Sequence, residues 1–86
     1  MMKLNWTVFL SQSGKELYDI CNLLNIVPSR VVTNNPKKMN EDVVTFLKAK
    51  GCELKTIPFK PLLEHYLQDD ILNSSIITLH GYLIRV

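Results

Sequence analysis

Apolar residues gather in four short stretches that have the composition of β-strands. Three of them are rich in aliphatic and β-branched residues, whereas the third along the chain also contains Glu53 and Lys55 and resembles a strand less. All four are too short for independent helices. They span Leu4–Leu10, Arg30–Thr33, Cys52–Ile57 and Ser75–Leu79. The pattern therefore predicts four strands, and the largely apolar first stretch suits a buried one.

The segments between these strands show helical spacing instead. Their apolar residues recur at intervals of three and four positions, which places them on one face of a helix. The three sets are Leu17, Ile20, Cys21 and Leu24; Val43, Phe46 and Leu47; and Leu63, Tyr66, Leu67 and Ile71. We therefore expect three amphipathic helices.

Particular residues mark where the first two helices begin and end. The stretch Ser13–Glu16 has the S-x-x-E pattern, which predicts a capping box at the start of the first helix. Asn25 is expected to end that helix, because Pro28 holds the preceding chain extended. Asn40 suits the N-cap of the second helix, and Gly51 suits the left-handed position just past its end.

The resulting order of elements is βαβαβαβ, in which helical crossovers join parallel strands. We expect an α/β fold: a three-layer, Rossmann-like half-domain with a mainly parallel four-stranded sheet, in one domain over residues 1–86. Ligands of such sheets bind beyond the carboxyl ends of the strands. Those ends are Ser11–Gly14, Thr33–Pro36, Pro58–Lys60 and the residues from His80 onward.

Composition and charge narrow the classes of function. The net charge is only +2, and ten basic residues are interleaved with eight acidic ones, which argues against nucleic acid as a partner. No apolar stretch approaches the ~20 residues of a membrane helix, and no signal peptide is recognised, so we expect a cytoplasmic protein without a membrane partner. Cys21 and Cys52 are expected to be buried or half-buried free thiols, and no residues have the spacing of metal ligands.

The stretch FLSQSGKEL, residues 9–17, leads from a strand into a helix, where α/β proteins often hold a phosphate. It is not a Walker A loop, because Phe9 replaces the first glycine and Glu16 replaces the Mg²⁺-binding Ser or Thr. Its single glycine also excludes the dinucleotide-binding G-x-G-x-x-G pattern. Two interpretations remain. Either the turn only caps the helix, or the helix N-terminus and Lys15 attract an anion, which Glu16 would oppose.

Few other polar residues suggest chemistry. His80 is either a general acid or base at the end of the last strand or a histidine packed at the mouth of a loop. Asn34 and Asn35 either donate hydrogen bonds to a ligand or stabilise a turn. His65 and Asp69–Asp70 are interpreted as solvated surface residues.

Three stretches of the chain resemble the N-terminal half of the folate-dependent formyltransferases, most closely phosphoribosylglycinamide formyltransferase of purine biosynthesis. VFLSQSGKEL is similar to the family's first strand, S-G-x-G-S-N-L turn and helix. RVVTNNP is similar to its second strand, and SIITLHGYLIRV to the strand that ends in L-A-G-[YF]-M-R-I-L. The resemblance spans nearly the whole chain but under half of a family enzyme.

The resemblance implies two half-sites. The first turn would hold the phosphate of a phosphorylated ribonucleotide amine, and the segment after the fourth strand would line the pocket of the cosubstrate 10-formyltetrahydrofolate. The phosphate-binding residues would be Ser11, Ser13, Gly14 and Lys15, and the folate-binding residues would be Tyr82, Leu83 and Arg85. In this turn Gln12, Lys15 and Glu16 replace the family's Gly, Ser and Asn, and Glu16 brings a negative charge toward the phosphate.

The resemblance also implies what the chain lacks. The family's catalytic Asn and His, in an N-x-H-P-S-L-L-P motif, and a later Asp would all lie beyond Val86. We therefore expect an incomplete domain without catalytic residues that does not transfer a formyl group alone. The family's strand order resembles 3-2-1-4, and Ile76–Leu79 would form an apolar edge for a homodimer or a C-terminal complement. The alternative is a small, non-catalytic α/β module for protein interaction.

Overall fold

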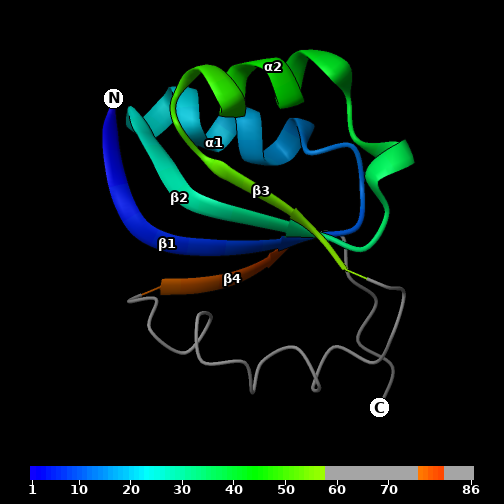
Figure 1. The fold of residues 1–86 in the computed structure, drawn as a ribbon. Coiled ribbons are helices and arrows are strands. Elements are labelled where there is room, and N and C mark those ends of the chain that lie inside the picture. Colours follow the sequence, from blue (N-terminus) through cyan, green and yellow to red (C-terminus); the bar gives the residue numbers. More distant parts are fainter. Residues whose placement is uncertain (58–75, 81–86) are drawn as a thin grey trace.

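The structure is a computed structural model that describes residues 1–57 and 76–80. Figure 1 shows an α/β arrangement of strands and helices. In chain order the elements are β1 (Met2–Leu10), α1 (Lys15–Leu24), β2 (Ile26–Thr33), the 3-10 helix η1 (Pro36–Lys38), α2 (Glu41–Ala49), β3 (Glu53–Thr56) and β4 (Ile76–His80). The predicted α/β class is confirmed for these residues.

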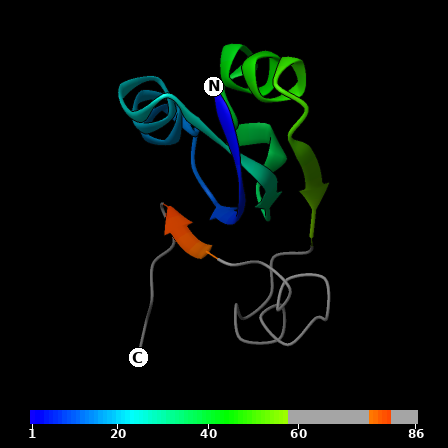
Figure 2. The same cartoon turned by 90° about the vertical axis from the view of Figure 1, so that its left-hand side faces the viewer.

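The strands form one sheet in the order β3-β2-β1-β4, and every neighbouring pair is parallel. α1 and α2 lie on the same face of this sheet (Figure 1), and the view at a right angle shows them side by side (Figure 2). Their common face results from right-handed crossovers that step across the sheet in the same direction. The predicted third helix falls in residues 58–75, outside the described residues, so the third layer stays a prediction.

β1 and β2 both begin earlier than the sequence pattern predicts, and an irregularity lies between them. The pairing register shifts between Leu4 and Thr7 of β1, opposite Pro28 of β2. Because proline has no backbone N–H, it cannot continue the ladder, and a bulge accommodates the break. Within this bulge the Ser29 hydroxyl donates to the Trp6 carbonyl at 3.2 Å, which gives that acceptor a partner.

The ends of α1 and α2 follow the predicted residues closely. Asn25 is the C-cap of α1 in a left-handed conformation (φ 55°), and Gly51, just past α2, is also left-handed (φ 79°). The Asn40 side chain caps α2 by accepting a hydrogen bond from the Asp42 N–H at 2.9 Å. Leu24, which the spacing places on one helix face with Leu17, Ile20 and Cys21, is the last residue of α1 and is 59% exposed.

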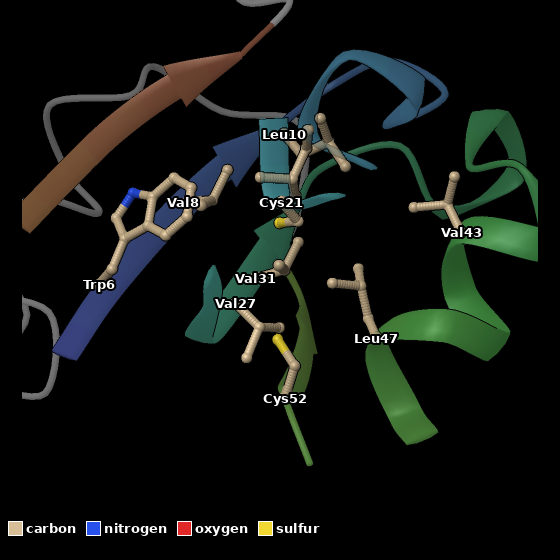
Figure 3. Close-up of a cluster of buried hydrophobic side chains, with 10 residues drawn as sticks. Trp6, Val8, Leu10, Cys21, Val27, Val31, Val43, Leu47 and Cys52 are labelled. Carbon is tan, nitrogen blue, oxygen red and sulfur yellow. The ribbon is translucent and has the colours of Figure 1, made fainter. Parts of the chain in front are cut away.

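The core lies between the two helices and the sheet (Figure 3). Its buried side chains come from β1, α1, β2, α2 and the residue before β3: Trp6, Val8, Leu10, Leu17, Cys21, Val27, Val31, Val43, Leu47 and Cys52. Phe9 and Val32, which alternate with these positions along β1 and β2, are fully buried as well. The two central strands are therefore apolar on both faces.

Candidate functional site

The carboxyl ends of β1 and β4 lie where the chain changes direction across the sheet. From β1 the chain passes through α1 to β2 on one side, whereas β4 pairs with the other side of β1. Leu10 is paired with His80, so the end of β4 lies beside the turn Ser11–Lys15, here called the β1 turn. In open parallel sheets, such a switch point is where ligands bind.

The start of α1 differs from the predicted capping box. Its N-cap is Gly14 and no side chain caps it, while Ser13 Oγ accepts only a long hydrogen bond of 3.4 Å from the Lys15 N–H. The prediction was wrong because Gly14 is left-handed (φ +87°), so the helix starts later and Glu16 is its second rather than its third residue. The capping interaction that would have occupied the first-turn N–H groups is therefore missing.

The β1 turn is fixed against the start of α2. A Cβ on Gly14 would lie 3.0 Å from Val43 Cγ1 and 3.2 Å from Leu10 Cδ2, so a side chain at this position would crowd both residues. The Asn40 N–H donates to the Ser13 carbonyl at 2.9 Å. Packing and hydrogen bonding thus set the shape of the turn before a ligand arrives.

Charged side chains are present at the start of α1 and in the loop after β2. Lys15 and Glu16 are exposed and occupy the first two positions of α1. Lys37 and Lys38 belong to η1, in the neighbouring loop after β2. The helix dipole and Lys15 favour an anion at the β1 turn, and Glu16 opposes it.

The loop after β2 contains two asparagines that the sequence pattern does not distinguish. Asn34 Oδ1 is buried and has no hydrogen-bond partner among the described residues. The N–H of Asn35, in contrast, donates to Thr33 Oγ1 at 3.0 Å, which is the turn role considered for this residue. A buried acceptor without a donor costs free energy. A ligand that donates a hydrogen bond to Asn34 Oδ1 would remove this cost.

An apolar groove of about 280 Å³ lies between α1 and β4, here called the α1–β4 groove, and the sequence pattern did not predict it. Its lining residues are Leu4, Trp6, Ile20, Leu24, Ile26, Ile76 and Thr78. The two residues that could have indicated it are Leu24 and Ile76, but the sequence pattern assigned Leu24 to the apolar face of a helix and Ile76 to the edge of a sheet. Their exposed fractions are 59% and 45%, because no described element covers them.

The structure describes only one of the two predicted half-sites. The residues predicted to bind phosphate lie together on the β1 turn. Tyr82, Leu83 and Arg85 lie outside the described residues, as do His65 and Asp69–Asp70. The backbone of His80 reaches the β1 turn through its pairing with β1.

Cys21 and Cys52 are buried free thiols, as predicted. Burial raises the pKa of both, that of Cys52 to about 12, and the nearby Lys3 ammonium offsets only part of this shift. Because the thiolate is the nucleophilic form, neither cysteine is suited to catalysis at neutral pH.

We expect the protein to lose stability as the pH rises above about 9, where an unfolded thiol ionises. The folded state keeps the Cys52 proton to higher pH than the unfolded state does, so rising pH favours unfolding. The loss due to this thiol should reach about 1.4 kcal/mol per pH unit at most. Urea unfolding between pH 8 and 11 measures it, and Cys52→Ala should show a weaker pH dependence. Identical pH profiles of the two proteins would contradict this assignment.

Within the described part of the chain, no group of His, Cys, Asp and Glu side chains could hold a metal ion. No helix found there is long and apolar enough to cross a membrane. No family model, curated protein or solved structure matches the chain.

Proposed function

We propose that this chain is a Rossmann-like half-domain, similar to the N-terminal half of the folate-dependent formyltransferases, and that it binds a phosphorylated ribonucleotide amine at the β1 turn. The observation that supports this most is the position of the turn at the switch point between β1 and β4. The strand order 3-2-1-4 is also the one that the resemblance implies, although other doubly wound folds share it.

The phosphate would be held mainly by backbone groups. The first-turn N–H groups of α1 point out of the helix start and lack a side-chain cap, and a helix N-terminus with such groups favours an anion. Lys15 adds a positive charge, and the Ser13 hydroxyl, which accepts only a 3.4 Å bond, can donate to a phosphate oxygen. Glu16 lowers the affinity through repulsion of the phosphate.

The second substrate would be 10-formyltetrahydrofolate, bound near Tyr82, Leu83 and Arg85 as the resemblance implies. Formyl transfer needs a donor to polarise the formyl oxygen and a base for the attacking amine. The resemblance assigns both roles to residues that this chain does not supply. We therefore propose that residues 1–86 contribute substrate binding, and that formyl transfer requires further residues that supply these two groups.

Calorimetry with glycinamide ribonucleotide and with a folate analogue tests this function. We expect heat with the ribonucleotide, and we expect Lys15→Ala to weaken its binding about tenfold or more, since hydrogen bonds to charged groups contribute about 1.5–3 kcal/mol. Glu16→Gln should tighten binding, because it removes a negative charge from the first turn of α1.

Lys48→Ala is the matched control for this measurement. Lys48 lies in the last turn of α2, away from the β1 turn, so its removal changes the net charge equally without touching the site. Equal weakening by Lys15→Ala and Lys48→Ala would mean that only the overall charge matters. Absence of heat from the wild type at millimolar ribonucleotide would refute the phosphate site.

The second candidate function is a non-catalytic module for protein interaction. The α1–β4 groove favours it, because exposed apolar surface that lines a groove is typical of contact sites. No heat with either ligand, together with a defined oligomer in solution, would favour this module over substrate binding.

A further inference from the structure

We draw no further inference here: the strongest candidate, the apolar α1–β4 groove that Leu24 and Ile76 line, supports no proposal because nothing in the described part of the structure shows what covers it.

Discussion

Replacing Leu47 with alanine is expected to lower the free energy of unfolding by about 2–5 kcal/mol, the range for a large aliphatic residue cut back in a core. Leu47 is fully buried in the cluster between α2 and the sheet, so its removal leaves a cavity that surrounding side chains fill only in part. A domain of this length has a total stability of roughly 4–13 kcal/mol. The substitution therefore removes a large share of it.

Urea unfolding measures this loss, with the fluorescence of Trp6, the only tryptophan of the chain, as the probe. Lys48→Ala is the control at the next position of α2. Lys48 is exposed, and its replacement should change stability by about 0.5 kcal/mol or less. A loss below about 1 kcal/mol for Leu47→Ala would show that α2 does not pack on the sheet through this side chain.

Replacing Gly14 with alanine is expected to cost about 2–5 kcal/mol, for two separate reasons. The left-handed backbone (φ +87°) costs a residue with a Cβ about 1–2 kcal/mol. The new methyl would also lie 3.0 Å from Val43 Cγ1 and 3.2 Å from Leu10 Cδ2, and such overpacking adds about 1–3 kcal/mol. The same variant should lose affinity for the ribonucleotide, because the β1 turn must shift to relieve the contact.

Gly51→Ala separates these two causes. Gly51 is left-handed as well (φ +79°), but a Cβ there would meet only the flexible end of Lys3, at 3.7 Å. This variant should show the backbone cost alone, about 1–2 kcal/mol, and should leave ligand binding unchanged. Equal losses of stability in the two variants would indicate that the close approach of Gly14 to α2 is not present in solution.

Local features of the chain were predictable because they depend on neighbouring residues. Asn25 ends α1 and Asn40 caps α2 through interactions within a few positions, and a single sequence contains that information. The capping box failed at Gly14 for the opposite reason. Val43 lies far from Gly14 in the sequence, but the two residues pack together in the fold. This packing helps to fix the residue at which α1 begins.

The candidate site was only half predictable. The turn after β1 was expected at the ligand-binding edge, since parallel strands place their carboxyl ends together. The asparagines after β2 were not separable by sequence. Only the folded chain shows that the Asn35 N–H is satisfied by Thr33, while Asn34 Oδ1 is buried without a partner in the described part.

By itself, the sequence determined the α/β class, the described order of strands and helices, and the burial of Cys21 and Cys52, because periodicity and caps act over short distances. The tertiary structure decided the register in which neighbouring strands pair, and so which residues meet. It placed His80 beside Leu10 at the switch point and left Leu24 and Ile76 exposed along one groove. An apolar pattern indicates that burial of a side chain would be favourable in free energy, but the packing of distant elements decides whether that side chain is buried.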